Sequence, residues 1–337
     1  MTSLLKQKSF FDSFPPPDYL LLSSAGVAIA DKGIKFIEFH RDLMSSKLRI
    51  KHSSRLILPP GVVESGTIRD TKALSAALKE LSGKHDLRYI HATLPEEKAY
   101  LFTAIIERVP FEGLRDAVAF ILEENVPVTL PESVFDFEVI DNDPSSTTLK
   151  VVVSVLPLKA VNAYVEAFES ADMTPVSFDI ESQAIARAII PEGDRRTQLV
   201  INWGEKRTGF YVIEDEVVQF STTPIHGLLA EASTPNLLDL KTEMRKVFAF
   251  WNSKPDKQGV PARQIERVLL CGGAVNDAPK IQELMTECPV PYSLADAWVN
   301  FSSAPDQVPD DVSKEPLEYL AAIGVALPMS EKIYVSH

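Results

Sequence analysis

Two segments of the chain alternate apolar and polar positions, reverse through a short polar turn and then alternate again. Residues 27–39 and 200–213 both follow this pattern. Period-two alternation on either side of a short turn is typical of a β-hairpin. Because one hairpin opens each half of the chain, we expect a duplicated architecture of the kind that could clamp a phosphate group between two lobes.

The rest of the first half predicts a mixed sheet. Residues 47–58 and 89–94 read as strands, and the helical spacing of residues 70–81 places a helix between them, with Asp70 as its candidate N-cap. Three strands followed by a helix and a fourth strand are typical of the start of an α/β sheet.

Between residues 97 and 174 the pattern changes. The predicted elements are strands at 100–109, 135–140 and 149–156 and helices at 111–125 and 159–171. This block can form a small α+β subdomain inserted into the first lobe. Beside that lobe it can leave a groove for an extended or helical peptide, although its apolar residues can equally form ordinary core.

The chain then returns to the first lobe and continues into the second. The further elements are a strand at 176–180, helices at 181–190, 237–252, 279–287 and 317–326, strands at 217–224 and 267–270, and a loop at 300–316. We therefore predict a leader (1–18), a first lobe (19–96 and 175–192), an insertion (97–174), a second lobe (193–330) and a tail (331–337).

Composition narrows the class of protein. A net charge of −13 argues against a nucleic-acid partner, because neutralising phosphates needs clustered Lys and Arg. The two cysteines, Cys271 and Cys288, are too few for a disulfide framework or a zinc cluster and suit a reducing cytosol. No metal-ligand spacing, transmembrane segment or cleavable signal is evident, so we predict a cytoplasmic protein without a metal centre.

The first hairpin carries three candidate cofactor-binding residues, Asp31, Lys32 and Gly33. In a hairpin that holds a nucleotide, an Asp at the end of the first strand orders the metal, and glycines let backbone amides reach the phosphates. Ala28 stands at that Asp position here. Asp31 could bind a displaced metal; alternatively, residues 31–33 form only a solvated turn with Gly33 in a left-handed conformation.

The second hairpin carries two further candidates, Gly204 and Thr208, which could contact phosphate. Lys206 and Arg207 could supply positive charge in place of close amide approach, while Asn202 stands at the position of the metal-ordering Asp. The alternative is a polar hairpin tip with no ligand.

Gly272 and Gly273 complete the candidate site. They lie between an apolar strand and a helix, where backbone amides can receive an anion or flank a base. A tight turn that needs a positive φ is the alternative. Asp179 and Glu181 could point carboxylates into a cleft between the lobes, or Glu181 could serve only as a favourable charge at a helix start. No catalytic residues are predicted, because no nucleophile, base or P-loop pattern is present.

The order of segments resembles the actin-like, ribonuclease H-like fold, and more narrowly the family of the type IV pilus assembly protein PilM, a relative of the division protein FtsA. The resemblance runs over about residues 27–328. Its best-matched stretches are Ala92–Glu96, 109–127, Phe135–Val139, Val153–Pro157, Phe178–Ser182, Leu269–Ala274 and Tyr319–Leu327.

The resemblance implies a cytoplasmic scaffold, peripheral to the inner membrane, that binds ATP with magnesium between its lobes. It also implies capture of the cytoplasmic N-terminal peptide of the membrane protein PilN, which brings the scaffold to the membrane and links it to the pilus motor complex. By position, the phosphate hairpins fall on residues 27–35 and 201–209, and the adenosine-side motif falls on Gly272 and Gly273.

The chain departs from the family at these hairpins. Where the family has Asp-x-Gly, residues 28–30 read Ala-Ile-Ala and residues 202–204 read Asn-Trp-Gly. Loss of a metal-directed charge and an added Cβ at Ala30 predict weakened binding of the metal nucleotide. We therefore expect a peptide-binding scaffold with a degenerate nucleotide cleft rather than an enzyme. An active actin-like ATPase and an FtsA-like division protein remain as alternatives.

Overall fold

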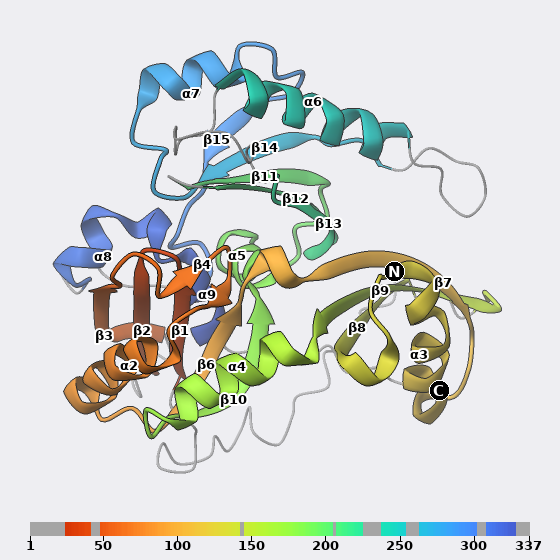
Figure 1. Ribbon diagram of the computed structural model, residues 1–337. Coiled ribbons are helices and arrows are strands. Elements are labelled where there is room, and N and C mark those ends of the chain that lie inside the picture. The colour runs from red at the N-terminus through yellow and green to blue at the C-terminus, as the bar shows by residue number, and fades with distance from the viewer. Residues whose placement is uncertain are drawn as a thin grey trace.

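Two five-stranded sheets with the same strand order form the framework of the protein in a computed structural model (Figure 1). The first comprises β1 (Ser24–Ala30), β2 (Gly33–Arg41), β3 (Leu48–Ile57), β6 (Tyr89–Leu94) and β10 (Thr174–Ile180), ordered β10-β6-β1-β2-β3. The second comprises β11 (Gln198–Trp203), β12 (Thr208–Glu214), β13 (Val217–Thr222), β14 (Arg267–Cys271) and β15 (Tyr292–Leu294), ordered β13-β12-β11-β14-β15. In each sheet an antiparallel three-stranded meander continues into two parallel strands, so both predicted hairpins are confirmed.

The structure describes residues 24–41, 48–141, 145–204, 207–224, 237–253, 263–301 and 308–327. The predicted leader and tail, and the candidate Lys206, lie outside these residues.

The helices form three layers around the two sheets. α2 (Thr71–His85) and α4 (Leu158–Glu169) pack on the outer face of the first sheet, and α6 (Leu237–Ser253) and α7 (Ala278–Met285) on the outer face of the second. α5 (Glu181–Ile189) and α9 (Leu320–Ala326) lie between the sheets, in a core that both share. We call the first sheet with α2 and α4 the first lobe, the second sheet with α6 and α7 the second lobe, and α5 with α9 the middle layer.

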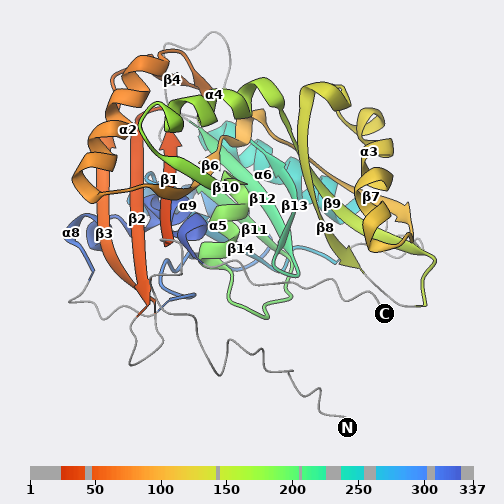
Figure 2. The ribbon, with the colours of Figure 1, turned by 90° about the horizontal axis from the view of Figure 1, so that it is seen from below.

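A third sheet stands beside the first lobe (Figure 2). It contains β7 (Tyr100–Glu107), β8 (Ser133–Asp141) and β9 (Thr148–Pro157) in the order β7-β9-β8, and α3 (Leu114–Asn125) covers it. Leu114, Val118 and Leu122 bury one face of α3 in a separate core. α4, which the predicted insertion included, packs instead in the core of the first lobe through Tyr164 and Phe168. We call β7, α3, β8 and β9 the insert.

Several predicted elements differ at their ends. The predicted loop at 300–316 contains the helix α8 (Asp310–Lys314), whose first-turn acids complement the helix dipole. The predicted helix at 317–326 starts only at Leu320, after a 3₁₀ turn at Pro316–Glu318. Shorter elements are β4 (Val63–Glu64), β5 (Thr67–Ile68) and the 3₁₀ turns Glu96–Lys98, Phe111–Gly113 and Leu130–Glu132.

Among the described helices, none combines the length and the apolar character needed to cross a bilayer.

The start of α2 follows the sequence prediction. Asp70 adopts an extended conformation, and its carboxylate accepts a hydrogen bond of 2.9 Å from the backbone N–H of Ala73. This bond satisfies one of the free amides at a helix start. Leu74, Leu78 and Leu81 then recur on the buried face, as the helical spacing requires.

The middle layer depends on close backbone approach. A Cβ added at Gly324 of α9 would overlap the carbonyl oxygen of Ala184 in α5, and one added at Gly26 of β1 would overlap the carbonyl oxygen of Ala322. Because both obstacles are backbone atoms, the neighbours cannot yield by a side-chain rotation. The two glycines therefore set how closely α9 packs against α5 and the first sheet.

Replacing Gly324 by Ala should destabilise the protein by about 3 kcal/mol, because the overpacked α9 has to move away from α5. The matched variant Gly83→Ala, at an exposed position of α2 with open space around it, should instead stabilise by about 0.5–1 kcal/mol. Midpoints of urea unfolding measure both changes. Equal midpoints for the two variants would contradict the close-packing argument.

Candidate functional site

A cleft between the two lobes is lined by both hairpin tips and by the turn after β14. Six of the seven candidate cofactor-binding residues line it: Asp31, Lys32, Gly33, Gly204, Gly272 and Gly273. The fold thus brings together residues that lie far apart in the sequence. The cavity measures about 170 Å³, whereas pockets for drug-sized ligands are roughly 300–1,000 Å³.

The first hairpin turns through Asp31 and Lys32 alone. Gly33 already belongs to β2, opposite Ala30, and it is not among the glycines with positive φ. The expectation of a left-handed Gly33 is therefore wrong, because the two-residue turn ends before it. Asp31 accepts hydrogen bonds from the backbone N–H groups of Ser65 (3.1 Å) and Gly66 (3.5 Å), so its carboxylate supports the neighbouring β4–β5 turn.

The second hairpin brings one of its two candidates to the cleft. Gly204 lines the cavity, and its N–H donates to the carbonyl oxygen of Arg207 at 3.0 Å. Thr208 is fully buried at the start of β12 and does not line the cavity, and its hydroxyl has no hydrogen-bond partner among the described residues. The hairpin tip instead presents Arg207.

The turn after β14 contains one left-handed glycine. Gly272 has φ of +94°, and a Cβ there would lie 2.5 Å from the carbonyl oxygen of Trp203. The alternative of a tight turn with a positive φ therefore holds for Gly272, which also lines the cleft. Gly273 lies against the carboxylate of Glu318, since a Cβ at Gly273 would overlap that group.

Glu318 joins two basic side chains of the first lobe across the cleft. Its carboxylate pairs with Lys35 at 2.7 Å and with Arg55 at 3.2 Å. Burial lowers the pKa of Lys35, and the hydrogen bond to Glu318 offsets this only in part. The space beside Gly273 is therefore occupied by a carboxylate that already has its counter-ions.

Arg207 makes a second set of ion pairs, between the lobes. It donates to the carboxylate of Glu181 at 2.6 Å and pairs with the carboxylate of Glu97. Glu181 begins α5, and Glu97 lies in the 3₁₀ turn after β6. Burial on its own would lower the pKa of Arg207, but the carboxylates of Glu181 and Glu97 more than offset it, so the pKa rises above its ordinary value.

Asn202 completes this set. Its side-chain amide donates to the other oxygen of the Glu181 carboxylate at 3.3 Å. Both alternatives for Glu181 hold in the structure: its carboxylate lines the cleft, and its charge lies in the first turn of α5. An Asp at position 202 would bring two carboxylates into contact. Asn202, which replaces the Asp of the family's Asp-x-Gly pattern, therefore suits the Glu181 carboxylate that faces it.

The carboxylates that the family pattern places at the two metal-ordering positions are absent from the cleft. Ala28 and Asn202 offer no carboxylate at the metal-ordering positions, and nowhere in the described ranges do three or more His, Cys, Asp or Glu side chains meet in a way that could hold a metal ion. Magnesium in nucleotide sites is bound through carboxylates and phosphate oxygens. The carboxylates that line the cleft are engaged within the protein. Glu181 and Glu318 pair with basic side chains, and Asp31 accepts from the backbone N–H groups of Ser65 and Gly66.

A second, larger cavity lies on the other side of the middle layer. It is a groove of about 930 Å³ where the insert, the first lobe and the second lobe meet. β8 lines one side and β10 the other, while α5 and the start of β13 contribute the remaining walls. β8 and β10 are outer strands of their sheets, and within the described part of the chain neither pairs with a further strand. Asp179, on β10, faces this groove and pairs with Arg187 at 2.6 Å.

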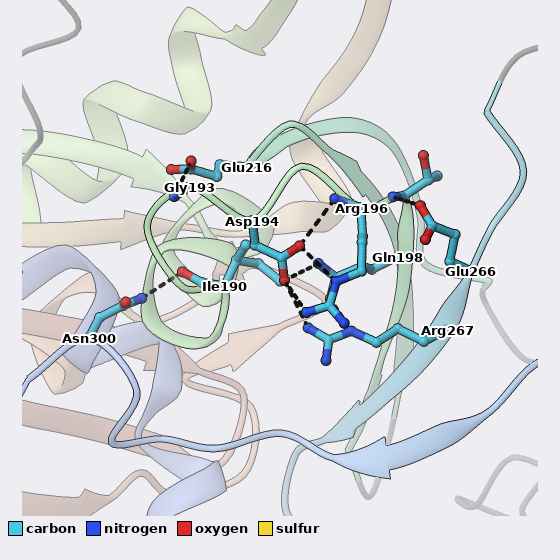
Figure 3. Close-up of polar contacts among 10 residues, drawn as sticks. Ile190, Gly193, Asp194, Arg196, Gln198, Glu216, Glu266, Arg267 and Asn300 are labelled. Atoms are coloured by element: carbon cyan, nitrogen blue, oxygen red, sulfur yellow. Dashed lines mark hydrogen bonds and ion pairs between the residues drawn. The ribbon is translucent and has the colours of Figure 1, made fainter. Parts of the chain in front are cut away.

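The groove reaches the segment that connects the lobes, since Ile190 and Glu192 are among its lining residues. Figure 3 shows the polar contacts of this segment. Asp194 accepts hydrogen bonds from Arg196 (2.6 Å), Gln198 (3.0 Å) and Arg267 (3.1 Å). The hydrogen bond from Arg196 is the main reason that the pKa of Asp194 falls to about 2. The side-chain amide of Asn300 donates to the carbonyl oxygen of Ile190 at 2.7 Å. The connection between the lobes is therefore held from both sides.

Sequence reasoning missed the partners in the cleft. Arg207 was a candidate for binding phosphate, but nothing in the sequence paired it with Glu97, which lies 110 positions earlier. Glu318 carried no signal, because it lies in a short turn. The signal that could have found the Glu181 contact is the coincidence of an Asn at position 202 with an acid at a helix start.

Replacing Asn202 by Asp should destabilise the protein by about 2 kcal/mol at neutral pH, because a hydrogen bond to a charged group is lost and two carboxylates face each other. The loss should shrink as the pH falls toward the ordinary carboxyl pKa, since protonation removes the repulsion. Urea unfolding at several pH values measures it.

The matched control is Asn252→Asp, because the side-chain oxygen of Asn252 accepts from the backbone N–H of Ile265 and a carboxylate can do the same. It should change the stability little. If Asn202→Asp is as stable as the unchanged protein at neutral pH, the Asn202–Glu181 contact does not hold the cleft.

Comparison with known proteins gives a strong structural likeness. The solved structure of the PilM-PilN type IV pilus biogenesis complex is similar over 90% of this chain and 98% of that chain, with a TM-score of 0.74 and 20% sequence identity. The ethanolamine utilization protein EutJ from Carboxydothermus hydrogenoformans covers 93% of this chain and 90% of its own at 13% identity, with a TM-score of 0.49. No curated protein sequence matches the chain.

The likeness to the PilM-PilN complex confirms the predicted fold: the duplicated sheets and the inserted subdomain form an actin-like α/β fold. A family model described as type IV pilus assembly protein PilM matches residues 26–229, which is more than half of the 337 residues. The chain therefore belongs to the PilM family of type IV pilus assembly proteins.

Proposed function

We propose that the protein is a cytoplasmic scaffold of type IV pilus assembly, which binds the cytoplasmic N-terminal peptide of a PilN-like inner-membrane protein in the groove. The observation that carries the proposal is the groove between two outer strands, β8 and β10. An outer strand has free backbone N–H and C=O groups along one edge. An extended peptide can bind such an edge as an added strand.

The chemistry of the groove favours an apolar peptide with positive charge. Val134, Val176, Phe178, Val217 and Val218 are among its apolar lining residues. Its charged lining residues are Asp136, Glu138, Asp179, Glu192 and Glu216 against a single arginine, Arg187. A strand presents alternate side chains to opposite faces, so a peptide with apolar residues toward the groove and Lys or Arg near its rim would match both features.

The comparisons support this proposal. The chain belongs to the PilM family, and the similar solved structure is described as a complex of PilM with PilN. We propose that the PilN-like partner recruits the protein to the cytoplasmic side of the inner membrane and that the scaffold links the partner to the pilus motor complex. No role in nucleic-acid binding is proposed, in keeping with the net charge of −13.

We propose further that the nucleotide cleft is degenerate and that the protein is not an ATPase. Three observations support this: the volume of about 170 Å³, the missing carboxylates at positions 28 and 202, and the ion pairs of Arg207 and Glu318 that cross the space. The peptide groove uses none of these residues, so partner binding does not require nucleotide chemistry.

A synthetic peptide with the cytoplasmic N-terminal sequence of the PilN-like protein from the same organism should bind the full chain. Val176→Arg should weaken binding at least about tenfold, or about 1.4 kcal/mol, because a charged side chain then enters an apolar wall. Val176 lies on β10 with 42% of its surface exposed, so the substitution leaves the core intact. Fluorescence anisotropy of the labelled peptide measures the affinity.

Ile57→Arg is the matched control. Ile57 is 82% exposed on β3, the opposite outer strand of the same sheet, so this variant should bind the peptide like the unchanged protein. A peptide that does not bind, or that binds Val176→Arg and Ile57→Arg equally well, would contradict the groove as the partner site.

Titration calorimetry with ATP and magnesium should detect no binding with a dissociation constant of about 1 μM or tighter. The reason is that positions 28 and 202 carry no carboxylate for the metal, and that Arg207, Lys35 and Arg55 already have carboxylate partners. An actin-like protein with Asp-x-Gly in both hairpins serves as the positive control. Micromolar binding by this chain, or turnover of ATP, would favour the alternative of an active ATPase.

A further inference from the structure

The strand β12 connects the cleft to the groove. Arg207, in the cleft, directly precedes its first residue, and the turn Asp215–Glu216, at the groove, directly follows its last. Its seven residues span roughly 20 Å. Because β12 pairs with β11 from Thr208 to Ile213 and with β13 from Phe210 to Glu214, it moves with the whole sheet of the second lobe.

Each end of β12 is attached to another part of the molecule. At the cleft, Arg207 pairs with Glu181 of α5 and with Glu97 after β6. At the groove, the carboxylate of Glu216 accepts a 2.7 Å hydrogen bond from the backbone N–H of Gly193, in the segment that connects the lobes (Figure 3). These two attachments fix the direction of β12 relative to the middle layer.

The attachment at the groove holds an unusual turn. Asp215 and Glu216 have φ of 52° and 69°, a left-handed conformation that favours Gly and Asn over Glu. Arg263 supports the turn through a 3.0 Å contact with Asp215. A turn of this kind persists where its surroundings determine it, and here they aim Glu216 at the connecting segment.

The groove depends on where β12 lies. Val217 and Val218, the first residues of β13, form the wall that the second lobe contributes. One residue further on, the Gln219 side chain accepts from Lys150 of the insert at 3.3 Å. A rotation of the second lobe away from the first would therefore draw this wall away from β8 and β10 and widen the groove.

The loss of Arg207 would leave like charges facing each other in the cleft. Without the guanidinium, the carboxylates of Glu97 and Glu181 would remain, largely buried, with Asn202 as a neutral donor to Glu181. Buried carboxylates without a counter-ion are strongly unfavourable. They would take up water or protons, and the cleft would open.

We propose that Arg207 acts as a built-in tie between the lobes, in the place where a bound ligand would otherwise join them, and that this tie holds the groove in its peptide-binding shape. Arg207 is thus a positioning residue that acts on the groove through β12 without touching it. The part of the proposal that concerns peptide affinity rests on the proposed function; the part that concerns the tie does not.

The test uses the full chain with Arg207→Ala and Arg207→Lys. Arg207→Ala should weaken binding of the PilN-like peptide at least tenfold and speed hydrogen exchange at residues 217–222, in the strand β13 that pairs with β12. Arg207→Lys should have an intermediate effect, since an ammonium lacks the planar fork that reaches two carboxylates; it also remains informative if Arg207→Ala fails to fold.

Arg245→Ala is the matched control, because Arg245 pairs with Glu287 at 3.6 Å with both side chains more than half exposed. This variant should change neither the peptide affinity nor the hydrogen exchange at residues 217–222. A third variant, Arg207→Ala with Glu97→Gln and Glu181→Gln, should recover part of the slow exchange, because the facing charges are gone. A role of Arg207 in general stability alone would speed exchange throughout the second lobe rather than at β13 and its neighbours.

The outcomes separate the two proposals. If the peptide binds the unchanged protein, and Arg207→Ala and Arg207→Lys alter neither affinity nor exchange at residues 217–222, the tie is refuted and the proposed function stands. If the peptide binds neither the unchanged protein nor any variant, the proposed function fails. The exchange measurement then still decides whether Arg207 holds the second lobe.

Discussion

The arrangement of the molecule depends on the burial of α5 and α9 between two sheets. Residues from both sheets and both helices share this core, including Ile37, Ile185, Val200 and Ile323. At Gly324 the backbones of α9 and α5 are so close that a Cβ would not fit between them. The same helix, α5, serves both cavities: it begins with Glu181 in the cleft, and Ala186, Arg187 and the following Ile190 line the groove. A tightly packed α5 therefore fixes the two cavities relative to each other.

Much of the fold follows from local pattern. The hairpins, the helix starts and the apolar faces could be predicted because period two, period 3.6 and the Asp70 cap are properties of neighbouring residues. The duplicated strand order could be expected from the repeated hairpin. The actin-like fold and the family, both predicted through resemblance, are confirmed by the comparisons.

The sequence predicted the position of the candidate site better than the contacts that its charged residues make. Asp31, Gly204 and Gly272 meet in one cleft, since the topology brings turns at equivalent ends of two duplicated sheets together. What the sequence could not indicate is how each charge is used, because the pairs of Arg207 with Glu97 and of Glu318 with Lys35 join residues far apart in the chain. The predicted left-handed conformation of Gly33 was wrong for a local reason, because the turn is one residue shorter than expected. The groove could be anticipated only as a possibility of assembly, because three separate parts of the fold form its walls.

The contact between Asn202 and Glu181 has a consequence for the history of the protein. In an ancestor with Asp at position 202, as the family pattern implies, a nearby acid at position 181 would have needed a cation between them. With Asn202 donating to Glu181 and Arg207 supplying the charge, we expect that neither an Asp at position 202 alone nor the removal of Arg207 alone is tolerated. If the cleft is degenerate as we propose, a return to nucleotide binding would need several substitutions at once, because each of the three side chains depends on the other two.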